Sequence, residues 1–329
     1  MKNILLDTIH FMSDIMDFWN TYDLISSTKS FASIRQDPRK CRFCNRTETE
    51  VTFKSEAHAL PELLGENKLI SQDECDDCNA LFGAFESHLS RFFIPYLTVL
   101  GVKGKRRVPA FHSRTVDRNE DTRTIFIVGP DGKRSLQIGD FNDYKIDEIN
   151  KTLSLSFRLP PHRPLFVYKA LVKIALSLLP EKQIRDFQNV YDWILGKEAA
   201  ISYLPVGFIT VLKRKKFAKP FADLYQAKKV VTENKFFPEL TLLVNFANII
   251  VQIFLPLSQN FKYEDSIGKS PELNIYPSFV LNNDLNEVKS TGKIKYNFTT
   301  IDFSSDASVE RDEILNFSYE SADLNIGRS

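Results

Sequence analysis

Residues 41–79 of this chain read CRFCNRTETEVTFKSEAHALPELLGENKLISQDECDDCN. All four cysteines of the protein lie in this stretch, as the two Cys-x-x-Cys pairs Cys41–Cys44 and Cys75–Cys78. Two such pairs can supply the four corners of one tetrahedral zinc ion, because each pair provides two adjacent thiolates and the intervening residues close the loop. Disulfides are the alternative for four cysteines, but the Cys-x-x-Cys spacing favours zinc. The sequence therefore predicts a structural zinc site with all four cysteines as its ligands.

Length and composition indicate a globular protein. The 329 residues are enough for two domains of ordinary size, and 43% of them are hydrophobic. Asp7, Asp14 and Asp17 interrupt the first twenty residues, so these residues do not form a secretory signal, and we expect a soluble, cytoplasmic protein. Because the net charge is only +1, any attraction to nucleic acid must come from local basic patches.

Residues 240–257 (LTLLVNFANIIVQIFLPL) are apolar enough to raise the question of a membrane span. Asn245, Asn248 and Gln252 interrupt this run, and its β-branched residues favour strands. We therefore predict two buried strands and no membrane partner.

The pattern along the chain predicts an α+β fold in four parts. Residues 1–36 hold an amphipathic helix over residues 3–24 and a linker at Ser26–Ser30. Residues 37–98 form the cysteine module, and residues 99–303 form a larger α+β domain. Residues 304–329 are acidic and polar, which is typical of a loosely held tail.

Within the larger domain, the expected elements follow from turn residues and hydrophobic periodicity. They are a hairpin formed by residues 123–128 and 133–138, a strand over residues 153–159, helices near residues 164–179 and 181–195, and a strand near residues 201–212. No phosphate-binding glycine loop or nucleophile elbow occurs there. Target recognition, sensing of an activating ligand or partner, and homo-oligomerisation are the roles open to this domain.

The residues between the cysteine pairs suggest a catalytic site. We predict a strand over residues 51–58, a turn at residues 61–65 and a helix over residues 79–93. The reference pKa of a histidine side chain lies close to working pH, so His58 is a candidate general base for phosphodiester hydrolysis. That reaction also needs a divalent cation with oxygen ligands. Asn79 and Glu56 are candidate ligands, with Glu62 as the rival carboxylate, and Asn79 follows a zinc ligand directly.

The pattern Cys41-x2-Cys44, Glu56-Ala-His58-Ala-Leu-Pro-Glu-Leu-Leu-Gly65, Asn67, Cys75-x2-Cys78-Asn79 resembles the HNH (ββα-metal) endonuclease family, in its zinc-stabilised form. The resemblance covers roughly residues 37–95 and implies a ββα-metal fold there. It implies that His58 is the general base, that Asn67 positions its strand or loop, and that Asn79 binds the catalytic Mg²⁺ or Mn²⁺. The family usually has an acidic residue or histidine directly before the catalytic histidine, whereas this chain has Ala57. Glu56 would have to take that place through a β-bulge.

His88 offers a second alignment, in which it is the last metal ligand and Asn79 is the central asparagine. Nine residues on a helix place His88 roughly opposite Asn79, so this alignment is disfavoured. Glu86 lies on nearly the same face as Asn79 and could support the site, although ordinary amphipathicity favours a solvated helix face for Glu86 and His88.

Two basic segments could contact phosphates. The first, which directly follows the predicted nuclease helix, contains Lys103, Lys105, Arg106 and Arg107, and the second covers residues 213–216. The hypothesis is a metal-dependent endonuclease that cleaves DNA, with RNA left open, of the kind found in bacterial restriction and phage defence. The alternative is a zinc-knuckle protein that binds nucleic acid or a partner without cutting.

Overall fold

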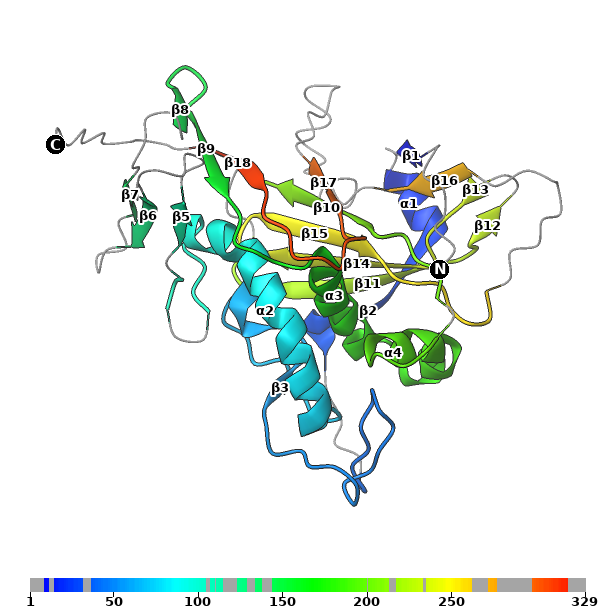
Figure 1. The fold of residues 1–329 in the computed structure, drawn as a ribbon. Helices are drawn as coiled ribbons and strands as arrows, with labels where there is room; N and C mark the ends of the chain where they lie inside the picture. Colours follow the sequence, from blue (N-terminus) through cyan, green and yellow to red (C-terminus); the bar gives the residue numbers. More distant parts are fainter. Residues whose placement is uncertain are drawn as a thin grey trace.

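The computed structural model describes the following residues: 9–11, 15–31, 37–104, 107–109, 111–114, 123–128, 134–137, 144–199, 201–212, 217–232, 235–261, 272–276 and 298–318. Helices and antiparallel sheets both contribute to the fold, which confirms the α+β class. Two long helices lie across a central sheet (Figure 1).

The central sheet has six antiparallel strands in the order β17-β10-β15-β14-β11-β2. These strands are β17 (Phe298–Asp302), β10 (Val206–Val211), β15 (Ile249–Phe254), β14 (Leu240–Phe246), β11 (Phe221–Ala227) and β2 (Tyr22–Ser27). Every residue of β14 and β15 is buried, so the apolar run at residues 240–257 forms two paired strands, as predicted. No helix within the described ranges is both long enough and apolar enough to cross a membrane.

The N-terminal segment differs from its prediction. In place of one helix over residues 3–24, the described part contains β1 (Ile9–Phe11), α1 (Ile15–Thr21) and β2, and the 3₁₀ helix η1 (Thr28–Ser30) lies where a linker was expected. The prediction was wrong because β2 is stabilised by pairing with β11, almost two hundred residues further along the chain. Local periodicity carries no information about such a partner.

Three helices cover one face of the sheet (Figure 1). They are α2 (Asp76–Val99), α3 (Pro164–Leu178) and α4 (Gln188–Ile194), with the 3₁₀ helix η4 (Glu181–Phe187) directly before α4. The helices predicted from periodicity are confirmed, although α2 begins three residues earlier and ends six residues later than expected. Most side chains of α3 are buried, because this helix packs between α2 and the sheet.

The opposite face carries α1 and a mixed sheet in the order β1-β16-β13-β12. The strands other than β1 are β16 (Glu272–Ile275), β13 (Lys235–Phe236) and β12 (Val231–Thr232). Phe18 of α1 packs against Tyr22, Tyr225 and Tyr276 with ring centroids 5.1–5.6 Å apart. The apolar side of the N-terminal segment is therefore buried against the large sheet.

Two smaller sheets complete the description. The strands β5 (His112–Arg114), β6 (Arg123–Val128) and β7 (Arg134–Gln137) form one, and the β6–β7 pair is the predicted hairpin. The other contains β8 (Tyr144–Asp147), β9 (Thr152–Arg158) and β18 (Asp312–Ser318). The loose tail expected over residues 304–329 is thus wrong for β18, which pairs with β9 along its whole length.

The cysteine region contains two short strands followed by α2. These strands are β3 (Ala57–His58) and β4 (Ile70–Ser71), paired antiparallel, with the 3₁₀ helix η2 (Glu62–Leu64) between them. Of the strand predicted over residues 51–58, only the last two residues are extended and paired. The hydrophobic core of this region is continuous with the core around α3. Phe43, for example, contacts Phe82 of α2 and Tyr191 of α4.

Candidate metal centre and histidine hairpin

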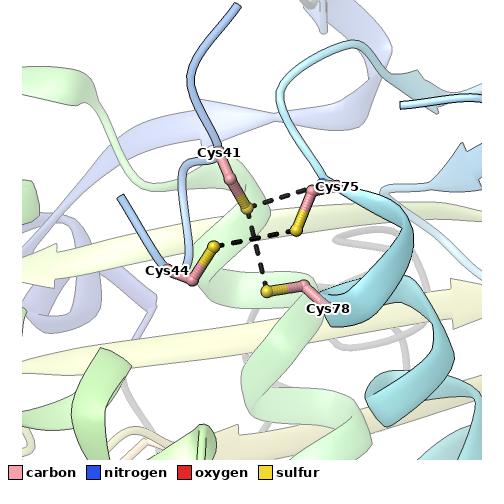
Figure 2. Close-up of side chains that lie close together, drawn as sticks. All are labelled: Cys41, Cys44, Cys75 and Cys78. Atoms are coloured by element: carbon pink, nitrogen blue, oxygen red, sulfur yellow. Dashed lines mark hydrogen bonds between the residues drawn. The ribbon is translucent and has the colours of Figure 1, made fainter. Parts of the chain in front are cut away.

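The four cysteine sulfurs form one compact cluster, in which all lie within 4.8 Å of one another (Figure 2). The Sγ atoms of Cys41 and Cys78 are 3.8 Å apart, and those of Cys44 and Cys75 are 3.7 Å apart. None of the cysteines is in a disulfide. A tetrahedral zinc ion with Zn–S bonds of about 2.3 Å requires sulfurs about 3.8 Å apart. The cluster therefore has the dimensions to hold a metal ion such as zinc.

Local hydrogen bonds explain how the two pairs come together. In the first pair, the amide of Asn45 donates to the oxygen of Cys41 at 2.9 Å, and Asn45 adopts a left-handed backbone with φ of 67°. This tight turn brings the two thiols to one side, and asparagine tolerates the conformation well. The second pair begins α2, since Cys75 is the residue that precedes the helix and Cys78 lies in its first turn. The amide of Cys75 points at the sulfur of Cys41 at 3.5 Å.

The thiols do not ionise equally. The hydrogen bond between the sulfurs of Cys41 and Cys78 lowers the pKa of Cys41 to about 5. Burial raises the pKa of Cys75 to about 12, and the hydrogen bond to Cys41 raises the pKa of Cys78. One thiolate therefore forms readily at Cys41, but the charge of a bound cation is needed to ionise Cys75 and Cys78.

The hairpin formed by β3 and β4 presents His58. Its strands pair Ala57 with Ser71 and His58 with Ile70. Asn67 shapes the connection between them, because its Nδ2 donates to the oxygen of Gly65 at 3.0 Å and its Oδ1 accepts from the amide of Leu69 at 3.2 Å. The side chain predicted to position this loop is therefore hydrogen-bonded at both ends to the loop backbone.

Asp76 fixes the entry to β3 against the start of α2. Its carboxylate accepts hydrogen bonds from the Thr52 hydroxyl and from the amides of Lys54 and Ser55, the last at 2.8 Å. The bond from Thr52, with help from the two amides, lowers the pKa of Asp76. The residues just before β3 are thus hydrogen-bonded to Asp76 at the start of α2, next to Cys75.

His58 is held by Glu62. Its Nε2 lies 3.5 Å from Glu62 Oε2, and the two side chains are 15% and 24% exposed. The Nδ1 atom is buried and has no hydrogen-bond partner among the described residues. The carboxylate therefore orients the imidazole through Nε2, a pairing that is also found where a histidine serves as a general base.

Of the two candidate acids, Glu62 is the one for which the structure shows an ion pair with His58. Glu56 lies one residue before β3 and its side chain is exposed, whereas Ala57 is buried. The proposal that Glu56 binds a catalytic metal remains a prediction. Asn79 lies in the first turn of α2 with its side chain partly exposed, and its amide donates to the oxygen of Cys75.

His88 and Glu86 have different surroundings from those expected of a solvated helix face. Nδ1 of His88 accepts the amide proton of Arg163 at 3.0 Å, and its ring meets Phe166 edge-on. It therefore caps the start of α3. Glu86 is partly buried, and burial raises its pKa while the nearby Lys173 opposes the rise.

Lys173 is the contact that sequence reasoning missed. Its ammonium donates to the main-chain oxygen of His58 and lies 3.0 Å from Glu74 Oε2. Burial raises the pKa of Glu74 to about 7, and the Lys173 charge opposes that rise. A signal was present in the sequence, since a lysine within the apolar helix 164–178 implies a buried anionic partner.

The first basic segment adjoins the hairpin. A Cβ added to Gly104 would lie 3.3 Å from the main-chain oxygen of Glu62, so this loop passes directly over η2. Lys103 and Arg107 are exposed there. Lys105, Arg106 and residues 213–216 lie outside the described residues, so the contacts predicted for them stay predictions.

Comparisons with protein-family models, with curated proteins and with solved structures found no match for this chain.

Proposed function

We propose that the protein is a metal-dependent nuclease in which His58 is the general base. The observation that carries the proposal is the His58–Glu62 pair on a β3–β4 hairpin that is followed directly by α2 and its two cysteines. Glu62 would orient the imidazole. His58 can then take a proton from a water molecule that attacks phosphorus.

The cysteine cluster would bind zinc in a structural role. Its sulfur separations of 3.7 and 3.8 Å suit zinc, and three of the four cysteines are buried. Structural zinc sites have four protein ligands, whereas catalytic sites leave one position for water. This zinc would join the first knuckle, which is the turn that carries Cys41 and Cys44, to the start of α2. It would thereby stabilise the β3–β4 hairpin that lies between them in the chain.

A second, catalytic divalent cation would need oxygen ligands near His58. Asn79 at the start of α2 and Glu62 in η2 offer such oxygens on partly exposed side chains. When bound, Mg²⁺ or Mn²⁺ would stabilise the negative charge that develops on the phosphate and on the leaving oxygen. Orientation of His58 and transfer of its proton depend on this chain's own residues.

The substrate we propose is DNA. The exposed cations Lys103 and Arg107 belong to the loop that crosses η2, which places positive charge near Glu62. Such side chains neutralise backbone phosphates without reading sequence. The part of the chain beyond residue 99 would choose the target or respond to an activator.

A second candidate is a zinc protein that binds nucleic acid without cleaving it. The buried side chain of Ala57 favours this candidate, because the residue before His58 offers no ligand for a catalytic cation. Under this candidate, His58 and Glu62 would only stabilise the hairpin.

The deciding experiment is cleavage of supercoiled plasmid DNA by the purified full chain with Mg²⁺ or Mn²⁺. His58→Ala should lower the cutting rate by about 100- to 10,000-fold, the usual contribution of a general base. The zinc content of this variant should be unchanged. A matched control is His10→Ala, since His10 also lies near a carboxylate, 3.3 Å from Glu272, but is 45% exposed on another sheet.

The proposal predicts full activity for His10→Ala and its loss for His58→Ala. Equal cutting by both variants would rule out His58 as the base. DNA binding without cleavage under either cation would support the second candidate.

A further inference from the structure

A buried ionic cluster joins α3 to the cysteine region. Lys173 and Glu74 have side chains that are 1% and 0% exposed, and the ammonium lies 3.0 Å from Glu74 Oε2. Glu86 lies close enough for Lys173 to influence its charge, and the ring centroid of Phe82 is 5.8 Å from the ammonium. A charged group placed so deeply is costly unless it makes specific contacts.

The strongest directed contact of this lysine is with the hairpin. Lys173 donates a hydrogen bond to the main-chain oxygen of His58, whereas neither Glu74 oxygen accepts a well-directed hydrogen bond from the described residues. Although the ammonium is near Glu74 Oε2, the attraction between them is therefore mainly electrostatic. The carboxylates balance the charge, and the hydrogen bond fixes where β3 lies.

Helix α3 is in turn fixed to the rest of the molecule. The Tyr168 hydroxyl donates to the oxygen of Phe254 in β15 at 2.6 Å, which holds α3 against the large sheet. At the other end, Arg42 of the first knuckle donates to the oxygen of Leu179 at 2.8 Å. The sheet, α3 and the hairpin thus form one connected series of hydrogen bonds.

We propose that Lys173 is a positioning residue for His58, through which α3 sets the geometry of the hairpin site. This inference rests on the proposed function for its catalytic consequence, while the structural coupling can be measured without activity. A shift of α3 against the sheet would move the carbonyl of His58, and with it the imidazole relative to the substrate. The residues after 99 would therefore control the site through a buried contact.

The test replaces the ion pair by neutral groups of similar size, so that no unpaired carboxylate remains at Glu74. Lys173→Met with Glu74→Gln removes the hydrogen-bond donor, and Lys173→Gln with Glu74→Gln keeps one. The matched control is Lys169→Met, since Lys169 lies one turn earlier on α3 and its ammonium is 4.6 Å from the Trp193 ring centroid. Each variant is made in the full chain and its zinc content is measured.

The first readout is the NMR signal of the His58 ring in histidine-labelled protein, identified by its loss in His58→Gln. The signal should move in the Lys173→Met double variant, move less in the Lys173→Gln double variant, and stay in place in Lys169→Met. The second readout is cleavage, in which kcat should fall by about 100-fold with KM little changed, as expected for misplacement by about 1 Å.

An unmoved His58 signal in a folded, zinc-loaded Lys173→Met double variant would overturn the proposal. Loss of zinc and fold in both double variants would also count against it, because Lys173 would then be a structural residue. If the wild-type protein cuts no nucleic acid, the proposed function fails, but the NMR comparison still decides whether Lys173 positions His58.

Discussion

Replacement of Arg42 with methionine tests whether the first knuckle and α3 form one cooperative unit. The Arg42 guanidinium donates to Asp73 Oδ2 at 2.7 Å, to the oxygen of Leu179 at 2.8 Å and, more weakly, to that of Leu176 at 3.4 Å. The last carbonyls of a helix have no partner within the helix. Arg42 therefore caps α3 from the cysteine region, and methionine keeps the packing of its stem while removing the donors.

The expected loss of stability follows from these contacts. A hydrogen bond from an ionised group contributes about 1.5–3 kcal/mol, and Arg42 makes two short ones. The side chains of Arg42 and Asp73 are 16% and 20% exposed, so water can replace part of what is lost and the lower end of the range applies. The free energy of unfolding should fall by about 3 kcal/mol in total. With an m-value of about 3 kcal/mol/M, the urea midpoint should drop by about 1 M.

Arg46→Met is the matched control, because Arg46 lies between the two cysteine pairs but is 41% exposed; it pairs with the more exposed Asp77 and donates to Cys44 Sγ at 3.3 Å, so the zinc content of the variant must equal that of the wild type. Its midpoint should stay close to that of the wild type, since exposed pairs contribute little. Urea unfolding followed by circular dichroism gives the midpoints, and zinc content is measured for both variants. Equal midpoints for Arg42→Met and Arg46→Met, with zinc retained, would refute the cooperative coupling.

Two further predictions concern the metal and the pH dependence of stability. Removal of metal by a strong chelator should unfold residues 41–99, because structural zinc contributes about 10–16 kcal/mol in small peptides. Amide hydrogen exchange in this segment should become faster on chelation and slower again when zinc is returned. Unchanged exchange rates would contradict a metal-stabilised module. Asp223 in β11 is buried and accepts a hydrogen bond from Ser27, and burial raises its pKa. The folded state therefore keeps this proton to a higher pH than the unfolded state does, so the contribution of Asp223 is complete below the unfolded pKa and is lost as pH rises through the folded pKa. Asp223→Asn should accordingly gain stability relative to the wild type between acidic and neutral pH in urea unfolding, and parallel pH profiles would contradict this.

Local pattern predicted several parts of the fold correctly. The β-branched residues in the apolar run at residues 240–257 indicated strands, and β14 and β15 form there. The periodicity of residues 164–179 predicted α3 almost to the residue. These predictions succeeded because α3, β14 and β15 are all buried, so their local apolar composition matches their final surroundings.

Long-range pairing was not predictable in the same way. The sequence predicted a helix end and a linker at Tyr22–Ser27, and a loose tail at Asp312–Ser318. Each of these segments forms a strand that pairs with a partner more than 150 residues away. A strand is stabilised by its neighbour, and nothing local to these segments identifies that neighbour.

The same division holds for the candidate site. The sequence by itself determined the four-cysteine cluster, because Cys-x-x-Cys spacing fixes two adjacent ligands through local turns. It also indicated His58 as a candidate general base, which stays a prediction, but it did not choose between Glu56 and Glu62. Only the tertiary structure placed Glu62 beside the imidazole and brought Lys173 to the carbonyl of His58. Those contacts depend on how a 3₁₀ turn and a helix 115 residues away pack against the hairpin, and that packing is a property of the whole core.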